Sequence, residues 1–412
     1  MLHHRCFPLR VGLSRVTFCS GLLLALTASC AQTGSARRGD LMIVGGGLQA
    51  ENAEVLGAFL HGTGQRIIVL PTASGVPLKS GPGAVSDLEL YASPDQSLGV
   101  LPILSDTPQH AQDAQYVRAI EEATGAWFTG GVQSRILAVF RPDGVDSPAY
   151  QAMVELLERG GMIGGSSAGA AMMCDPMIAW GNSREALLCG VHGDTEDQAL
   201  GIEQGMGFFP FGLVDQHFLR RGRIGRLVVA LEHTGQTLGF GIAENSALAV
   251  DLAKARGRVL GTRAVVVVNS AGSVQSGLSR RGLRVSLLSS GDEVDLKRGK
   301  VRVDPSKHAI QPSAEAIDSE GEALGPWDRY ALSLLMERLA RAPESEQRAS
   351  DEVFSLVLRA DSRTQFRASD EAWTHFTVID AILDIEALPG AESAAEALKG
   401  ELTSLDLAPN QP

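Results

Sequence analysis

The sequence predicts an α/β protein with a doubly wound, mostly parallel sheet, and three observations lead to that fold class. Short apolar runs alternate with helical patterns between residues 41 and 163, as in repeated βαβ units. The runs are apolar at nearly every position, which is typical of strands buried on both faces. Glycine-rich turns at Gly45, Gly130 and Gly164 close three of the runs, and such sheets form their sites at the carboxyl ends of strands.

Five strands with intervening helices are expected in this first part of the chain. The strands are expected at residues 41–44, 66–70, 100–104, 126–129 and 162–163. Helical patterns cover about residues 51–60, 109–123 and 147–159, and a further helix is expected to begin at Ser134. This alternation suits parallel strands, because the crossover between two of them usually contains a helix.

Two other kinds of structure are expected later in the chain. Further β-like runs occupy residues 237–242, 247–250, 264–268 and 283–288, and the last two suit an antiparallel extension of the sheet. From about residue 305 the pattern changes to helices with acidic faces, at about residues 327–340, 350–358, 371–388 and 394–402. These patterns predict a helical C-terminal appendage. It carries no catalytic motif, so we expect the chemical step not to need it.

The first thirty residues are expected to be an export leader rather than part of the fold. Residues 1–15 contain three arginines and no acid, and an apolar run follows to about Ala28. That run is too short to span a bilayer comfortably but suits the apolar region of a secretory signal. Residues 26–30 resemble a bacterial lipobox ending at Cys30, whose thiol would be lipidated. Cleavage after Ala31, giving a freely secreted or periplasmic protein, remains the alternative.

The chain is therefore divided into a leader (1–30), a polar linker (31–40), one α/β domain (41–300) and an acidic helical extension (305–412). Its 412 residues are 44% hydrophobic and 20% charged, which excludes disordered, collagen-like and coiled-coil proteins. A net charge of −12 argues against a nucleic-acid partner. The acidity is concentrated after residue 300, where 10 Lys and Arg face 21 Asp and Glu.

Cysteine usage predicts neither a disulfide framework nor a zinc site. Outside the leader only Cys174 and Cys189 remain, and no spacing of ligands suggests a bound metal. No cofactor is expected either. In an oxidising compartment the two cysteines could form a disulfide, or both could remain thiols.

A candidate nucleophile follows the fifth strand. Gly165-x-Ser167-x-Gly169 has the frame of a nucleophile elbow, whose small residues allow a tight turn that presents the serine hydroxyl. The amide of Ala168 would begin the next helix and face an oxyanion. A turn without chemistry, or one that binds an anion, fits the same residues.

A serine nucleophile needs a base and an acid from elsewhere in the chain. His217 follows an apolar run in Val-Asp-Gln-His-Phe, and Glu244 closes the run at residues 237–242. Both positions suit strand ends, so Glu244 could orient His217. Taken singly, each has a plainer interpretation, as a structural histidine and a loop acid.

Together these segments resemble a known family. Gly-Gly-Ser-Ser-Ala-Gly-Ala (164–170), Asp-Gln-His-Phe-x-x-Arg-Gly-Arg (215–223), Gly-Ile-x-Glu (241–244) and Phe-Thr-Gly-Gly-Val-Gln (128–133) occur in the order found in cyanophycinases. These serine peptidases are related to aspartyl dipeptidases. The resemblance extends from about residue 41 to residue 296 and implies a flavodoxin-like fold of the class I glutamine amidotransferase type.

The resemblance also implies residue roles. Ser167 would be the nucleophile, His217 the base and Glu244 its orienting acid, with the oxyanion held by the amides of Gly131 and Ala168. Three further residues match substrate-binding positions of the family: Gln133, Asp215 and Arg221. Arg221 could bind a carboxylate through two hydrogen bonds.

The predicted function is that of an exported serine-type exopeptidase that cleaves aspartyl bonds of a cyanophycin-like Asp/Arg polymer to dipeptides. Val132 and Ala243 depart from the family's usual residues near the cleft, so substrate choice stays open. One alternative is a hydrolase of the same fold for another isoaspartyl or Asp-rich peptide. The other is a non-catalytic lipoprotein that binds the polymer. The sequence is compatible with a homodimer and with a lipid anchor.

Overall fold

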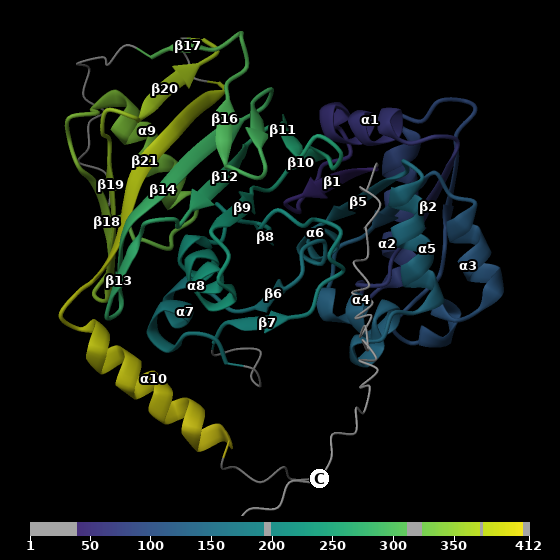
Figure 1. Ribbon diagram of the computed structural model, residues 1–412, viewed down its shortest axis with the longest axis horizontal. Coiled ribbons are helices and arrows are strands. Elements are labelled where there is room, and N and C mark those ends of the chain that lie inside the picture. Colours follow the sequence, from purple (N-terminus) through teal and green to yellow (C-terminus); the bar gives the residue numbers. More distant parts are fainter. Residues whose placement is uncertain (1–38, 193–198, 311–323, 371–373, 407–412) are drawn as a thin grey trace, which may run out of the picture. The chain divides into compact units, whose positions relative to one another are not determined.

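The computed structural model describes residues 39–192, 199–310, 324–370 and 374–406, all within one compact unit (Figure 1). The predicted leader, Cys30 and most of the linker lie outside these residues. No helix among the described residues is long and apolar enough to cross a membrane.

A nine-stranded sheet forms the first half of the fold and confirms the predicted α/β class. Its strand order is β16-β15-β11-β10-β1-β5-β4-β2-β3. The parallel part comprises β1 (Asp40–Val44), β5 (Met162–Ser166), β4 (Gly125–Phe128), β2 (Arg66–Leu70) and β3 (Ser97–Val100). The antiparallel part comprises β10 (Ser246–Asp251), β11 (Arg256–Gly261), β15 (Glu293–Asp295) and β16 (Lys300–Arg302).

Helices cover both faces of the parallel part, as the buried strands predict. Alternate residues of β1 point to opposite faces: Met42 packs in one apolar cluster with Phe59, while Ile43 packs in another with Leu156. The first face carries α1 (Ala53–Gly62) and α2 (Pro77–Glu89). The second carries α3 (Ala114–Glu121), α4 (Gln133–Phe140) and α5 (Pro148–Glu158).

The helix α2 does not appear among the predicted elements. It contains Pro82 together with Gly81, Gly83 and Ser80, which are poor helix formers. Pro77 at its first turn has the backbone angle that a helix start requires, and Leu88 anchors the other end in the core. Tertiary packing therefore stabilises a helix that local preference does not favour.

A second, ten-stranded sheet corrects the prediction for residues 264–268 and 283–288. They do not extend the first sheet, since they lie in β12 (Ala264–Asn269) and β14 (Ser279–Ser289) of the second. The strand order is β17-β20-β21-β14-β12-β9-β8, with β13, β18 and β19 attached at the side. The other strands are β8 (Leu213–Asp215), β9 (Leu238–Ile242), β13 (Val274–Ser276), β17 (His308–Ala309), β18 (Gln347–Ser350), β19 (Phe354–Arg359), β20 (Gln365–Ala368) and β21 (Phe376–Ala387).

The C-terminal extension is only partly helical, which corrects the predicted appendage. The helices α9 (Ala331–Arg341) and α10 (Ala391–Asp406) match two of the four predicted segments. The other two contain β19 and β21, because their Val, Ile, Phe and Thr residues suit a half-buried sheet better than a helix. In Figure 1, β21 (yellow) runs beside β14 (green), so the extension completes the second sheet.

Besides the pairing of β21 with β14, contacts of three kinds join the extension to the remainder of the compact unit: a buried ion pair, a backbone hydrogen bond and a close backbone approach. Lys307 is buried and donates from Nζ to Asp292 Oδ1 at 2.8 Å. The amide of Tyr330 donates to the Leu219 carbonyl oxygen at 2.8 Å. At Gly222, whose φ is +54°, a Cβ would lie 2.3 Å from the Trp327 carbonyl oxygen. The last two contacts lie beside the turn that carries His217.

The remaining elements lie outside the two sheets. They are α6 (Ala168–Ala171), α7 (Ser183–Cys189), α8 (Ile224–Thr234), the hairpin strands β6 (Met177–Trp180) and β7 (Gly201–Glu203), and two 3-10 turns, Pro108–Ala111 and Pro142–Gly144.

Candidate active site

The turn after β5 has the strained geometry expected of a nucleophile elbow. Ser167 has φ +58° and ψ −109°, which is rare for a residue with a side chain. Its amide donates to the Val44 carbonyl oxygen at the end of β1, at 3.0 Å. A Cβ at Gly165 would lie 2.3 Å from the Gly169 carbonyl oxygen, so the turn closes only with glycine there.

His217 lies against this turn at the end of β8. Its backbone is left-handed, with φ +48°, and its amide donates to the Gly45 carbonyl oxygen at 2.7 Å. Its Nε2 lies 2.9 Å from Ser167 Oγ. At Gly46 a Cβ would lie 2.3 Å from His217 Cε1, so glycine is needed to leave room for the ring.

Glu244 follows β9 and completes the group. Its Oε1 lies 2.6 Å from His217 Nδ1, and its Oε2 accepts from Arg220 at 2.5 Å. Because a carboxylate accepts at Nδ1, we assign the ring proton to Nδ1, which leaves Nε2 to accept from the Ser167 hydroxyl. The amide of Asn245 donates to the Gly46 carbonyl oxygen at 2.9 Å, so two neighbouring strand-end turns are held together.

The surroundings favour a neutral imidazole and an ionised carboxylate. Burial lowers the pKa of His217, and the charges of Arg221 and Arg223 lower it further, against the opposing hydrogen bond to Glu244. Burial alone would raise the pKa of Glu244, but hydrogen bonds from Arg220 and His217 outweigh it and the pKa falls. The pair is thus prepared for one proton transfer, from the serine hydroxyl to Nε2.

Two amides beside the serine are available to hold an oxyanion. Ala168 is the first residue of α6, so its N–H has no partner within the helix. Gly131 has φ +147°, and a Cβ there would lie 2.0 Å from the Ala73 carbonyl oxygen. Among the described residues, neither N–H donates to a protein acceptor. Their role toward substrate stays a prediction.

A cleft of about 580 Å³ opens over Ser167 and His217. One of its walls is α2, whose residues at helical spacing face the cleft: Val76, Lys79, Ser80, Gly83, Ala84, Asp87 and Leu88. Lys79 and Asp87 thus place a cation and a carboxylate in the cleft. Burial raises the pKa of Asp87, and the Glu51 charge adds to the rise. Neither residue is predicted from the sequence, because α2 itself is not.

Arg220 is another residue of the site that the sequence does not predict, although it lies within the block that contains His217. Its position between Leu219 and Arg221 carries no motif signal, and only the fold brings it to Glu244.

Two of the residues predicted to contact substrate are hydrogen-bonded to other protein groups and do not line the cleft. Gln133 is buried and donates from Nε2 to the carbonyl oxygens of Ile178, at 3.0 Å, and Ala179. Asp215 is buried and accepts two hydrogen bonds from Arg226, one of them at 2.8 Å. Their contact with substrate stays a prediction.

The third predicted contact, Arg221, is exposed, and its amide donates to the His217 carbonyl oxygen at 3.1 Å. Its charge lies close enough to lower the pKa of His217.

The two cysteines of the domain are unpaired thiols. Cys174 is buried, and burial raises its pKa to about 12. No group of three His, Cys, Asp or Glu residues is placed to bind a metal in the part of the chain that the structure describes.

The chain is similar to several known proteins. Residues 41–257 match the model of peptidase family S51. The chain is 30% identical over 275 residues to the cyanophycinase of Geminocystis herdmanii, covering 63% of this chain and 94% of that protein. It is 29% identical over 285 residues to the cyanophycinase of Thermosynechococcus vestitus, covering 65% of this chain and 82% of that protein. Among solved structures it is similar to a peptidase from an acI-B1 actinobacterium, with TM-score 0.43 and 19% identity over 63% of this chain and 98% of that one.

Proposed function

The chain belongs to peptidase family S51, and from this membership and the site geometry we propose that it is a serine-type exopeptidase that hydrolyses aspartyl peptide bonds. One observation carries the proposal: Ser167, His217 and Glu244 form a continuous line of hydrogen bonds at 2.9 and 2.6 Å. Nucleophile, base and orienting acid are within reach of one another before any substrate binds.

The chemistry would proceed in two halves. Ser167 Oγ attacks the carbonyl carbon of the scissile bond while His217 Nε2 takes the hydroxyl proton. The oxyanion accepts hydrogen bonds from Gly131 and Ala168, and Glu244 stabilises the imidazolium. The C–N bond then breaks and His217 gives its proton to the leaving amine. Water attacks the acyl-enzyme by the same route and restores Ser167.

The proposed substrate is cyanophycin or a related polymer, an aspartate backbone bearing arginine side chains. Two relatives named cyanophycinase support this choice. The cleft supports it as well, because Lys79 and Asp87 on one wall offer partners for the carboxylate and the guanidinium of one repeating unit. Val132 departs from the residue usual in the family, and it is 43% exposed next to Gly131, whose amide is predicted to bind the oxyanion. Because of this departure, another aspartate-rich peptide is the second candidate substrate.

The test is to incubate purified protein with cyanophycin and, separately, with β-aspartyl dipeptides, and to identify products by mass spectrometry. We expect β-Asp-Arg from the polymer and none with the Ser167→Ala variant. Cleavage of the dipeptides alone would favour the second candidate. Binding of the polymer without any product would favour the non-catalytic lipoprotein and reject the peptidase.

We propose in addition that the protein is exported and lipidated at Cys30. The motivation is the arginine-containing, acid-free start, the apolar run and the small residues that precede Cys30. Mass spectrometry of the native N-terminus checks it. An intact Met1 would reject export, and an unmodified Cys30 at the mature terminus would reject lipidation alone.

A further inference from the structure

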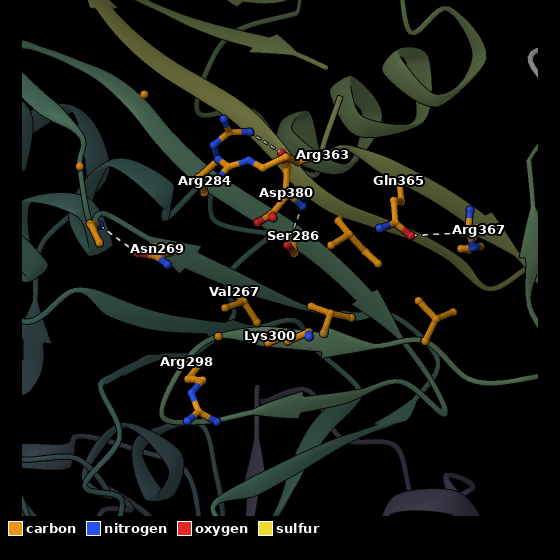
Figure 2. Close-up of a pocket in the computed structure, with 17 residues that line it drawn as sticks. Val267, Asn269, Arg284, Ser286, Arg298, Lys300, Arg363, Gln365, Arg367 and Asp380 are labelled. Carbon is orange, nitrogen blue, oxygen red and sulfur yellow. Dashed lines mark hydrogen bonds between the residues drawn. The ribbon is translucent and has the colours of Figure 1, made fainter. Parts of the chain in front are cut away.

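A second cavity, of about 870 Å³, lies on the second sheet and shares no residue with the catalytic cleft. It is formed by β12, β14, β20, β21 and the segment from Arg298 to Val303 (Figure 2). The match to family S51 ends at residue 257, before all of these segments begin. The cavity therefore belongs to a part of the chain to which nothing described above assigns a role.

The charged residues around the cavity are mostly cationic. Among the described residues they are Arg284, Arg298, Lys300, Arg363 and Arg367, with Asp380 as the one acid. Figure 2 shows Arg298 and Lys300 on the opposite side of the cavity from Arg284 and Arg363, so the cations come from separate elements. This is unexpected in a chain of net charge −12, and more so because Arg363 and Arg367 belong to its acidic end.

Protein partners compensate only part of this charge. Arg284 bonds to Asp361 at 2.6 Å, and that hydrogen bond lowers the pKa of Asp361 to about 2. Arg298 lies 3.4 Å from Asp295, but its side chain is 80% exposed, so this pair is weak. In the part of the chain that the structure describes, Lys300, Arg363 and Arg367 form no ion pair. Arg367 donates to the Phe366 carbonyl oxygen and to Gln365 Oε1, both at 3.1 Å, but these acceptors are neutral. The charges of all three cations therefore remain for an anionic ligand.

A backbone irregularity shapes the cavity. Between β14 and β21 the pairing passes from Val285–Ala381 to Leu287–Val378, so Ile379 and Asp380 together oppose Ser286. This is a β-bulge, with Asp380 at φ +56° and its amide donating to Ser286 Oγ at 3.0 Å. All three bulge residues line the cavity. Bulges commonly occur where a sheet forms a binding site.

The lining favours an organic ligand with several carboxylates. Four apolar side chains lie among the cations: Val267, Val301, Val303 and Ile379. They suit the methylenes of a peptide better than a fully hydrated phosphate. None of the lining residues that the structure describes is aromatic, so these residues offer no surface for stacking nucleic-acid bases. Arginine side chains can hold carboxylates through two parallel hydrogen bonds.

We propose that this cavity binds an acidic peptide, whose carboxylates pair with Lys300, Arg363 and Arg367 while its methylenes cover the apolar side chains. The site is separate from the catalytic cleft, and the inference goes beyond the proposed function and does not depend on it.

The test is calorimetric titration of the full chain at low ionic strength with a tetra-aspartate peptide, acetylated at one end and amidated at the other. The matched neutral probe is the tetra-asparagine peptide with the same caps, and the inorganic probe is triphosphate. We expect the aspartate peptide to bind best and its affinity to fall as salt is added. Equal binding of the asparagine peptide would overturn the proposal. Tighter binding of triphosphate would also overturn it, in favour of a phosphate site.

Variants place the binding in the cavity. The triple variant Lys300→Gln/Arg363→Gln/Arg367→Gln should weaken the aspartate peptide at least about tenfold. The control triple Arg118→Gln/Arg184→Gln/Arg329→Gln removes the same charge from exposed positions outside the cavity lining and should change affinity less than about twofold. Equal losses in both triples would reject the cavity as the site. Thermal unfolding of each variant confirms that it is folded.

The Ser167→Ala variant separates this inference from the proposed function. It cannot hydrolyse the peptide by the proposed route, and it leaves the second cavity unchanged. We expect it to bind the capped tetra-aspartate peptide as the wild type does. A loss of affinity in this variant would place the peptide in the catalytic cleft and overturn the proposal, whatever the outcome of the hydrolysis assay.

Discussion

The two adjacent serines of the turn after β5 have different surroundings. Ser166 is the last residue of the strand, and Ser167 has the left-handed backbone and the bond to His217. Both line the cleft. Only Ser167 directly precedes Ala168, whose amide has no protein acceptor among the described residues. A substrate carbonyl attacked by the Ser167 hydroxyl would therefore have His217 as the base on one side and the Ala168 amide as the oxyanion donor on the other.

The three residues should therefore act as one unit. We expect Ser167→Ala and His217→Ala each to lower kcat nearly as far as the double variant, because either change removes the same proton transfer. Glu244→Gln should cost less, since the base remains. Turnover of a cleavable aspartyl peptide measures this, with Ser166→Ala as the matched control. An inactive Ser166→Ala beside an active Ser167→Ala would show that the elbow is misassigned.

The pH profile should show the lowered pKa of His217. In the proposed mechanism the neutral ring is the base, so activity should fall as pH falls through this pKa, and the acid limb should lie below the ordinary histidine value of about 6.5. Replacing Arg220 by Gln removes the cation that neutralises the negative charge of Glu244. That charge then stabilises the imidazolium more strongly, so the pKa of His217 rises and the acid limb should move to higher pH.

The control for Arg220→Gln is Arg329→Gln, at another exposed arginine. It should leave the profile unchanged. We expect only a several-fold loss of plateau kcat in Arg220→Gln, because Arg220 acts through Glu244 as a positioning residue. An acid limb that stayed in place would mean that Arg220 has no part in setting the charge of the site.

The grouping of Ser167, His217 and Glu244 was predictable from the sequence, because each residue follows a strand. A small-residue turn, an isolated Asp-Gln-His and a lone Glu each occupy a strand end, and the family resemblance supplies their order. Arg220, Lys79 and Asp87 were not predictable. Their side chains reach the site through the packing of a turn and a helix, which no local spacing encodes.

At the scale of elements, the wrong helix prediction for residues 371–388 has an identifiable cause. The pattern for residues 371–388 contains acids at Asp380, Asp384 and Glu386, which suggested the polar face of a helix. In β21, Asp384 is buried and bonds to Arg359, while Asp380 lies in the bulge. In the sequence, an acidic residue that is buried in a sheet and paired with an arginine looks the same as one on the exposed face of a helix.

The short segment that joins β16 to β17 should matter for stability out of proportion to its size. Lys307 Nζ bonds to Asp292, Ser289 and Thr377 in the interior. Lys307→Met would leave the buried Asp292 carboxylate without a cation, and we expect a loss of about 3–5 kcal/mol in the free energy of unfolding. Urea denaturation measures it.

Two further variants test the cause of that loss. Lys297→Met changes an exposed lysine and should be nearly neutral. Asp292→Asn in the Lys307→Met background should restore part of the stability, because the unpaired charge is then gone. If Lys307→Met alone remained within about 1 kcal/mol of the wild type, the buried pair would not be a stabilising element.

At the scale of the whole molecule, the extension is needed for folding even though it supplies no residue to the triad. A chain that ends at residue 304 would leave β14 without β21, Asp292 without Lys307 and the His217 turn without Trp327 and Tyr330. We expect that chain to show no cooperative unfolding by circular dichroism. A chain that ends at residue 406 should unfold like the full chain. A folded, active 1–304 chain would contradict this.

The pairing of β14 with β21 also has a consequence in time. A ribosome has made every residue of the triad once it passes Glu244, but it must add the residues up to Ala387 before the second sheet can close. At ordinary rates of translation that interval is on the order of ten seconds. During it the nascent chain carries a complete set of catalytic residues and no finished support for the His217 turn. We therefore expect the proposed hydrolytic activity to appear only when synthesis is nearly complete. A chain stalled at residue 300 on the ribosome should be digested by added protease, whereas the released full chain should resist it.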